Sequence, residues 1–112
     1  MKTIEGDLTI KNKKIALVAG RFNSFVVEHL ISGAKGALLK HGADDSDIDL
    51  LYVPGAFEIP LALKKAASAG KYDGIVALGA VIRGGTPHFE FVAGECVKGI
   101  SKVALESEIP IA

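Results

Sequence analysis

The sequence predicts an α/β fold, a three-layer α/β/α sandwich around a mainly parallel sheet. Short apolar runs alternate along the chain with segments in which apolar residues recur every three or four positions. The apolar runs are continuous, as is typical of strands that helices cover on both faces. Strict alternation of strand and helix requires crossover connections between parallel strands, and these are right-handed in nearly all folds.

The composition fits one such domain. The chain has 112 residues, of which 49% are hydrophobic and 23% charged, which lies outside the ranges of disordered and membrane proteins. A domain this short buries only roughly 60 to 70% of the surface that its unfolded chain exposes. We therefore expect a single domain over residues 1–112 that gains stability from association with further subunits.

Charge and the N-terminus restrict the partners and the location. Thirteen basic residues balance thirteen acidic ones, and no basic cluster is longer than Lys11 to Lys14, which argues against a nucleic-acid partner. Lys2, Glu5 and Asp7 lie where a signal peptide needs an apolar run, and no window reaches the roughly 18 apolar residues of a membrane span. These features predict a cytoplasmic protein with no membrane partner.

The first strand-helix unit begins after Lys14. Residues 15–19 form a short apolar run that predicts a strand covered on both faces. Apolar residues at helical spacing between Val27 and Leu38 predict a helix, with Ser24 as its N-terminal cap and Gly42 at its end.

The second unit repeats this pattern. Residues 48–53 form the second apolar strand, and residues 54–60 form a loop bounded by two prolines. Residues 61–69 are predicted as a helix that Gly70 closes.

The third unit has a longer strand, predicted over residues 74–82. A loop over residues 83–86 follows, and Thr86 is predicted to cap a third helix with Pro87 at its first position. Apolar residues recur at helical spacing from Val92 to Ala104 along this helix.

Two terminal segments lie outside these units. Residues 3–10 alternate weakly and could form an edge strand, either in this sheet or added to the sheet of a neighbouring copy. Residues 109–112 resemble the opening of a fourth strand that stops as it begins. We therefore expect a sheet that is incomplete at the C-terminus.

The three loops that follow the strands should converge on one edge of the sheet, where α/β proteins bind ligands. In the first loop, residues 20–23, Phe22 is an aromatic residue on a polar turn and could stack on a flat ligand. The alternative is a hydrophobic staple, in which Phe22 packs onto the following helix at Val26 or Val27.

The second loop holds a glycine and a carboxylate between two prolines, which fix its backbone. Glu58 could accept hydrogen bonds from the hydroxyl groups of a ligand. Its alternative role is a favourable charge at the start of the second helix, worth about 0.3 to 1 kcal/mol.

The third loop combines a glycine pair with a histidine. Gly84 and Gly85 allow backbone amides to approach an anion at the positive end of a helix. The segment is not a P-loop, because no Gly-Lys-Ser/Thr follows. In the first turn of that helix, the dipole disfavours the charged form of His88, which could then exchange protons with a bound substrate. His29 and His41 are expected to be ordinary exposed histidines.

The single cysteine, Cys96, cannot form an internal disulfide. It lies among apolar residues of the predicted third helix, which favours a buried structural thiol over a nucleophile.

Three segments of the sequence together resemble a known family. Gly-Arg-Phe-Asn at 20–23, Val-Pro-Gly-Ala-Phe-Glu-Ile-Pro at 53–60 and Gly-Ala-Val-Ile-Arg-Gly-Gly-Thr-Pro-His-Phe at 79–89 are similar to the signature segments of the 6,7-dimethyl-8-ribityllumazine synthases, in the same order and spacing. The resemblance implies a flavodoxin-like sheet. It also implies condensation of 5-amino-6-(D-ribitylamino)uracil with 3,4-dihydroxy-2-butanone 4-phosphate in riboflavin biosynthesis, with no metal and no organic cofactor.

The resemblance implies a role for each site residue. Phe22 would stack on the pyrimidine, and His88 would transfer protons. The ribityl chain and its surroundings would contact Ala56, Phe57 and Glu58, the uracil site would be lined by Ala80, Val81 and Ile82, and the phosphate would meet Gly85 and Thr86.

The family assembles as pentamers or 60-subunit shells with sites shared between subunits, and its chain continues past position 112 with the rest of a fourth strand, two helices, a phosphate-binding arginine and a second aromatic contact. Two other interpretations stay open. The chain could be a truncated or split scaffold that serves assembly without catalysis, or a non-catalytic flavodoxin-like module that binds a flat ligand or a phosphate. The role of His88 distinguishes the non-catalytic binding module from an enzyme.

Overall fold

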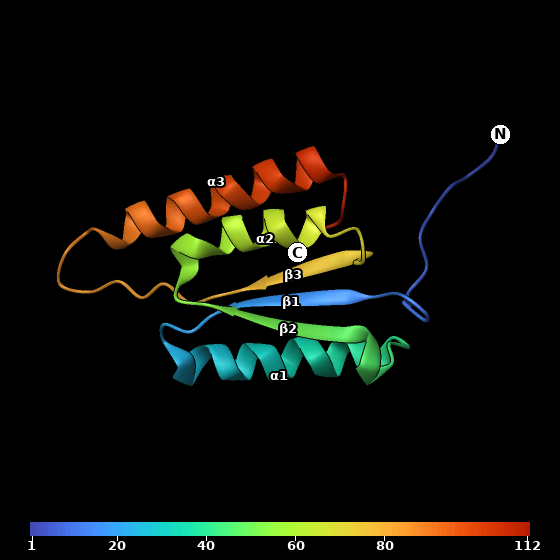
Figure 1. Cartoon of the computed structure of the whole chain (residues 1–112), viewed down its shortest axis with the longest axis horizontal. Coiled ribbons are helices and arrows are strands. Elements are labelled where there is room, and N and C mark those ends of the chain that lie inside the picture. Colours follow the sequence, from blue (N-terminus) through green and yellow to red (C-terminus); the bar gives the residue numbers. More distant parts are fainter.

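The computed structural model describes all residues from 1 to 112, and Figure 1 shows three layers in which α1 covers one face of the sheet while α2 and α3 cover the other. The elements are β1 (Ile15–Gly20), α1 (Ser24–Lys40), the 3-10 helix η1 (Asp45–Asp47), β2 (Ile48–Val53), the 3-10 helix η2 (Ala56–Glu58), α2 (Ile59–Ser68), β3 (Gly74–Leu78) and α3 (Phe89–Ser107). None of the helices combines the length and the apolar character that a membrane crossing requires.

The three strands form one sheet in the order β2-β1-β3, and both pairs are parallel. Ile15 at the start of β1 lies opposite Ile48 of β2 and Gly74 of β3. The predicted α/β fold with a parallel sheet flanked by helices is therefore confirmed. Parallel pairing in this register brings the carboxyl ends of all three strands to the same edge of the sheet.

The central strand β1 explains the continuous apolar run in the sequence, because all six of its residues are buried. Its side chains alternate between two apolar clusters, one on each face of the sheet. The cluster beneath α2 and α3 includes Ala16, Val18, Ile59, Leu63 and Cys96, and the cluster against α1 includes Ile15, Leu17, Ala19, Val27 and Ile31. A strand covered on both faces has no position at which a polar side chain would reach water.

The helices α2 and α3 approach closely at a glycine. A Cβ atom added to Gly99 of α3 would lie 2.4 Å from Cγ of Pro60 in α2, well inside van der Waals contact. The proline ring is rigid, so the two helices would have to separate to admit a side chain there. In contrast, a Cβ atom added to Gly94 of the same helix would meet nothing within 4 Å.

These two glycines give a matched prediction. Replacing Gly94 by Ala should raise the free energy of unfolding by roughly 0.5 to 1 kcal/mol, because alanine favours the helix and no contact opposes it. At Gly99, overpacking of the new methyl group against Pro60 should lower the free energy of unfolding by about 1 to 3 kcal/mol. The gain in helix propensity offsets part of this loss. Urea unfolding of both variants measures the difference. Equal effects at the two positions would contradict the close contact.

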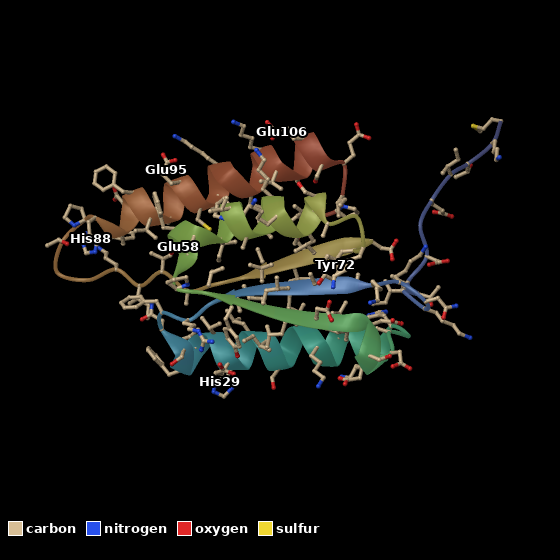
Figure 2. The ribbon with its side chains drawn as sticks, in the orientation of Figure 1. His29, Glu58, Tyr72, His88, Glu95 and Glu106 are labelled. Carbon is tan, nitrogen blue, oxygen red and sulfur yellow. The ribbon has the colours of Figure 1, made fainter.

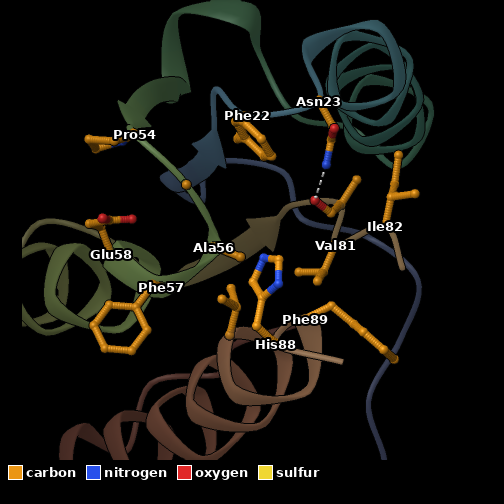
Figure 3. A pocket seen from close by; sticks show the side chains of 13 residues that line it. Phe22, Asn23, Pro54, Ala56, Phe57, Glu58, Val81, Ile82, His88 and Phe89 are labelled. Atoms are coloured by element: carbon orange, nitrogen blue, oxygen red, sulfur yellow. Dashed lines mark hydrogen bonds between the residues drawn. The ribbon is translucent and has the colours of Figure 1, made fainter. Parts of the chain in front are cut away.

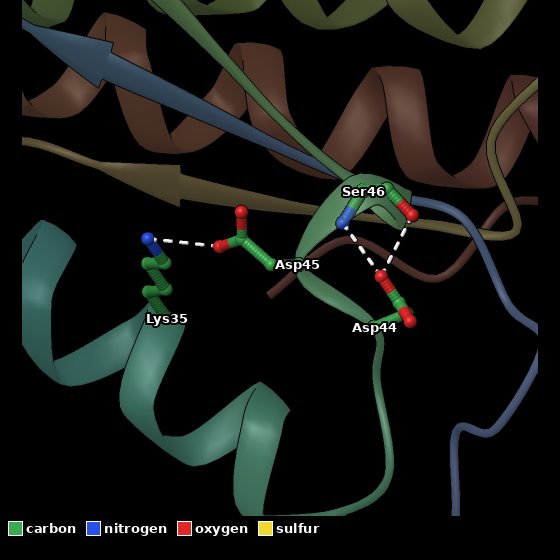
Figure 4. Close-up of polar contacts among 4 residues, drawn as sticks. All are labelled: Lys35, Asp44, Asp45 and Ser46. Carbon is green, nitrogen blue, oxygen red and sulfur yellow. Dashed lines mark hydrogen bonds and ion pairs between the residues drawn. The ribbon is translucent and has the colours of Figure 1, made fainter.

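The connection from α1 to β2 is held by short-range polar contacts (Figure 4). The carboxylate of Asp44 accepts hydrogen bonds from the backbone N–H of Ser46 at 2.9 Å and from its hydroxyl at 2.7 Å, and so caps η1. These bonds lower the pKa of Asp44 below its usual value. Lys35 of α1 forms an exposed ion pair with Asp45 at 2.9 Å.

A second polar cluster lies at the amino end of the sheet, opposite the loops that follow the strands. The hydroxyl of Tyr72 donates a hydrogen bond of 2.6 Å to the carboxylate of Asp49, and Nζ of Lys71 lies 3.4 Å from the same oxygen atom. The bond from Tyr72, which Figure 2 labels, is the main cause that lowers the pKa of Asp49. Burial is the main cause that raises the pKa of Tyr72. This cluster joins the first residues of β2 to the turn before β3.

This cluster predicts a pH dependence. Because folding lowers the pKa of Asp49 from 3.8, its contribution to stability is full well above pH 3.8 and is lost as the pH falls below that value. Asp49→Asn should therefore be less stable than the parent at pH 7, and the two should converge as the pH falls below 3.8. Urea midpoints over this range test it, with Asp47→Asn as the neighbouring control. A constant difference across the range would contradict it.

The starts of two helices differ from the prediction. Asn23, in a left-handed conformation with φ of 61°, is the N-cap of α1, and Ser24 is the first helical residue. The third helix begins at Phe89 with His88 as its N-cap, so Thr86 is not a cap and Pro87 is not helical. The reason is that the hydroxyl of Thr86 is hydrogen-bonded to the ring of His88 and not to an amide of the helix.

The middle of the chain shows two further differences. β3 ends at Leu78, four residues before the predicted end, because its partner β1 pairs only as far as Leu78 and residues 79–82 then leave the sheet. The predicted loop before the second helix contains η2, and α2 begins at Ile59, two residues earlier than predicted. Pro60 is tolerated in the first turn because no hydrogen bond is required of its nitrogen there.

The terminal segments behave differently from one another. Residues 3–10 form no strand in this sheet, because the segment is hydrogen-bonded to the end of α1, where the N–H of Ile10 donates to the carbonyl of His41 at 2.9 Å. Addition of the segment to a neighbouring copy's sheet stays a prediction. Near the C-terminus, Ile111 forms an isolated parallel bridge with Ile75, on the side of β3 away from β1, in the place predicted for a fourth strand.

Candidate functional site

A cavity of about 320 Å³ lies at the carboxyl edge of the sheet, between the three loops that follow the strands (Figure 3). The residues predicted to bind the pyrimidine and the ribityl chain all line it, and so does His88. They are Phe22, Ala56, Phe57, Glu58, Ala80, Val81 and Ile82. Gly85 and Thr86 lie outside the lining.

The first loop is fixed by backbone bonds that continue from the sheet. The N–H of Arg21 donates to the carbonyl of Val53 at 2.8 Å, and the N–H of Phe22 donates to the carbonyl of Pro54 at 3.0 Å. Phe22 lines the cavity and is 73% exposed as a residue. This exposure is the opposite of a hydrophobic staple onto α1, which would bury the ring, and it leaves a face available for stacking.

The second loop brings a carboxylate to the cavity. Glu58 ends η2 and occupies the N-cap position of α2, but its side chain makes no capping hydrogen bond. Its Oε2 lies 3.4 Å from where a Cβ atom on Gly55 would be, so the carboxylate folds back over the loop. Glu58 therefore combines both predicted features, a negative charge at a helix start and an acceptor beside the cavity.

The third loop forms the opposite wall. The side-chain amide of Asn23 donates a hydrogen bond of 2.9 Å to the carbonyl of Ala80, which Figure 3 marks with a dashed line. Val81 and Ile82 follow with 36% and 52% of their surface exposed. The cavity thus has an aromatic ring on the first loop and apolar side chains on the third.

The glycine pair lies farther along the same loop, towards the start of α3. The backbone amides of Gly84, Gly85 and Thr86 donate no hydrogen bond within the chain. A Cβ atom at either glycine would meet nothing within 4 Å, so the backbone is open to solvent. These amides have no partner within the chain, and anion binding at the glycine pair stays a prediction.

His88 lies where the third loop enters α3, and its ring reaches into the cavity (Figure 3). Nδ1 of the ring is hydrogen-bonded to the hydroxyl of Thr86. That bond leaves Nε2 as the ring nitrogen that can meet a ligand. The direction of the Thr86 bond decides whether Nε2 carries the proton, since neutral imidazole has one donor and one acceptor.

Five lining residues were not predicted as site residues. Two of them, Pro54 and Gly55, belong to the second loop, whose backbone was predicted to be available to a ligand without a role for either residue. Asn23 was quoted in the sequence segment without a role, Phe89 follows the histidine, and Val92 was assigned only to the apolar stripe of the helix. The ring of Phe89 also stacks with Arg83, whose guanidinium carbon lies 5.7 Å from the ring centre. The sequence signal that could have identified Asn23 is its residue type, since asparagine tolerates the positive φ of a turn that follows a strand.

Other candidate groups lie away from the cavity. His29 projects from the outer face of α1, as predicted (Figure 2). Cys96 is 8% exposed in the core beneath α3, which confirms a buried thiol, and burial raises its pKa. No three His, Cys, Asp or Glu side chains converge to form a metal-binding group.

The fold and the cavity agree with a comparison with known families. A family model described as 6,7-dimethyl-8-ribityllumazine synthase matches residues 12–112. The match includes all three strands, all three helices and the three loops that form the cavity. This chain belongs to the 6,7-dimethyl-8-ribityllumazine synthase family, which is a family of enzymes.

Proposed function

We propose that this chain forms the substrate site for the condensation of 5-amino-6-(D-ribitylamino)uracil with 3,4-dihydroxy-2-butanone 4-phosphate to give 6,7-dimethyl-8-ribityllumazine. One observation carries the proposal. Phe22, Glu58 and His88 come from three separate loops and line one cavity. Its volume of about 320 Å³ is at the lower end of the range typical of small-molecule sites.

Each substrate part has a chemically suitable wall. The pyrimidine would stack on Phe22, with Ala80, Val81 and Ile82 along its edge. The ribityl hydroxyls would donate hydrogen bonds to the carboxylate of Glu58 and lie beside Ala56 and Phe57. Mostly apolar walls with a few placed polar groups are the usual lining of such sites.

The phosphate of the second substrate would lie at the free amides of Gly85 and Thr86. These amides are near the N-terminal end of α3, where the helix dipole favours an anion. An anion here would lie beside His88, so the phosphate and the proton-transfer group would act on the same part of the substrate.

The chemistry requires protons to move near neutral pH. Imine formation, phosphate elimination and ring closure each transfer a proton, and Nε2 of His88 is the ring nitrogen available for this step. Much of the remaining rate would come from holding an amine and a ketone in the correct mutual orientation. This mechanism needs no metal or organic cofactor.

The direct test supplies both substrates to the purified protein and follows lumazine fluorescence and phosphate release. We expect both products in equal amounts. Binding of the pyrimidine without product would favour the flavodoxin-like binding module. If the chain assembles into oligomers but neither binds the pyrimidine nor forms product, the scaffold interpretation is favoured.

The phosphate site gives a separate prediction. Gly85→Val should weaken the binding of inorganic phosphate about tenfold or more, since branched side chains restrict the loop and cover its amides. Isothermal titration measures this effect, and Gly33→Val on the exposed side of α1 is the control for a general effect of valine. Unchanged phosphate affinity in Gly85→Val would place the anion elsewhere.

Exposed apolar side chains support an assembly of several copies. Phe91 is 75% exposed and Leu105 is 80% exposed on α3, while Leu61 on α2 is 65% exposed. Contiguous exposed apolar patches mark protein interaction sites, and these three side chains are the candidates for such a contact. We propose a cytoplasmic homo-oligomer, a pentamer or a 60-subunit shell, with sites shared between subunits. Native mass spectrometry determines the number of copies.

A further inference from the structure

The third loop is tied to the rest of the protein at one point. Between the end of β3 and the turn before α3, residues 79–86 make one hydrogen bond to a sequence-distant part of the chain, from Asn23 to the carbonyl of Ala80, besides the local bond between Thr86 and His88. The loop is otherwise largely exposed. Apart from the apolar packing of Ala80 against the cluster beneath α1, one side chain provides the polar tether of this wall.

Asn23 is suited to this contact by its backbone. Its φ of 61° and ψ of 44° are in the left-handed region, which asparagine adopts more readily than other residues that carry a side chain. Its carbonyl accepts bonds from the amides of Val26 and Val27 at 3.0 and 3.1 Å, so it caps α1 through the backbone. The side chain makes no cap bond and is free to reach the third loop.

The contact joins all three loops. Phe22, the residue before Asn23, is bonded through its amide to the carbonyl of Pro54 in the second loop. Asn23 then bonds to Ala80 in the third loop at 2.9 Å. Two consecutive residues thus set the distance between the aromatic ring on one side of the cavity and the Ala80 wall on the other.

We propose that Asn23 is a positioning residue, which holds the third loop so that a flat ring fits between Phe22 and the Ala80 wall. Its effect on the pyrimidine rests on the proposed function, whereas the tether itself does not. Without the amide, the wall would be free to move away from the ring, and the pyrimidine would bind more weakly. The phosphate amides, farther along the loop, would be less affected.

Two variants separate the hydrogen bond from the backbone conformation. Asn23→Gly keeps access to positive φ and removes the amide. Asn23→Asp keeps the shape and the tolerance of positive φ but directs an oxygen atom at the carbonyl of Ala80, where it cannot donate. Asn12→Gly is the matched control, because Asn12 also has positive φ, at 66°, and does not line the cavity.

The first measurement uses no substrate. Trypsin should cleave after the exposed Arg83 several-fold to about tenfold faster in Asn23→Gly, the range expected for loss of one hydrogen bond. Cleavage in Asn23→Asp should be at least as fast, while Asn12→Gly should match the parent. Thermal unfolding of each variant checks that the fold is retained. Equal cleavage rates in all four proteins would overturn the tether.

The second measurement tests positioning. The KM for 5-amino-6-(D-ribitylamino)uracil should stay at the parent value in Asn12→Gly, rise in Asn23→Gly and rise further in Asn23→Asp. Changes in kcat and in the affinity for inorganic phosphate should be smaller. Faster cleavage after Arg83 with an unchanged KM would overturn the positioning role. If the parent forms no lumazine, the proposed function fails, and the cleavage rates together with affinity for the lumazine product still decide the role of Asn23.

Discussion

His88→Ala is expected to lower kcat for lumazine formation roughly 10²- to 10⁴-fold, the usual contribution of a general acid-base group. The ring lines the cavity, and the Thr86 bond to Nδ1 leaves Nε2 for the substrate. Affinity for the pyrimidine should change little, because stacking on Phe22 and contact with the third loop do not involve the imidazole. Steady-state assays with each substrate varied in turn measure both quantities.

The control for this variant is His29→Ala. His29 is an exposed histidine of α1 that does not line the cavity, so its loss should leave kcat at the parent value. Thr86→Val gives an intermediate test, since it removes the hydroxyl bonded to Nδ1 and should lower kcat less than His88→Ala does. If His88→Ala retains the parent kcat while the parent makes lumazine, proton transfer belongs to another group.

Leu63→Ala is expected to lower the free energy of unfolding by about 2 to 5 kcal/mol. Leu63 of α2 is fully buried, in the cluster that packs β1 against α2 and α3. Truncation removes apolar contacts and leaves a cavity that the surrounding side chains fill only in part. A domain of this size has a total stability of about 5 to 15 kcal/mol, so the variant could be largely unfolded at 37 °C. Urea unfolding followed by circular dichroism measures the loss.

Leu61→Ala is the matched control, because it makes the same chemical change two residues away on the same helix. Leu61 is 65% exposed, and its truncation in the separated chain should change stability by less than about 0.5 kcal/mol. A loss that appears only at concentrations where the chain assembles would place Leu61 at a contact between copies. Similar losses for both leucines in the separated chain would contradict the packing of α2.

Much of the fold could be predicted from the sequence, because apolar periodicity reports burial directly. The run from Ile15 predicted a strand covered on both faces, and β1 is buried throughout. The second strand was predicted at its observed bounds, Ile48–Val53. The end of β3 could not be predicted, since Val81 and Ile82 are as apolar as the strand before them. The strand ends where its pairing with β1 ends, at Leu78 opposite Ala19, and this pairing is a tertiary property.

The candidate site was predicted in part. Residues 20–23, 53–60 and 79–89 each follow a strand, and parallel pairing was sufficient to bring them to one edge. The role of Asn23 could not be predicted, because its bond to Ala80 spans 57 positions and depends on how the loops meet. The same holds for the start of α3. A threonine before a proline resembles a cap, but its hydroxyl is used by the imidazole two residues later.

The strand order also determines what happens while the chain is being synthesised. Both neighbours of β1 follow it in the sequence, so a nascent chain cannot form its first pair of strands until the ribosome has released residue 53. Until then, six consecutive residues destined for the interior face water and other emerging chains. Such segments are prone to aggregate. We therefore expect the early nascent chain to bind chaperones that recognise exposed apolar segments more tightly than a chain whose synthesis has passed residue 53.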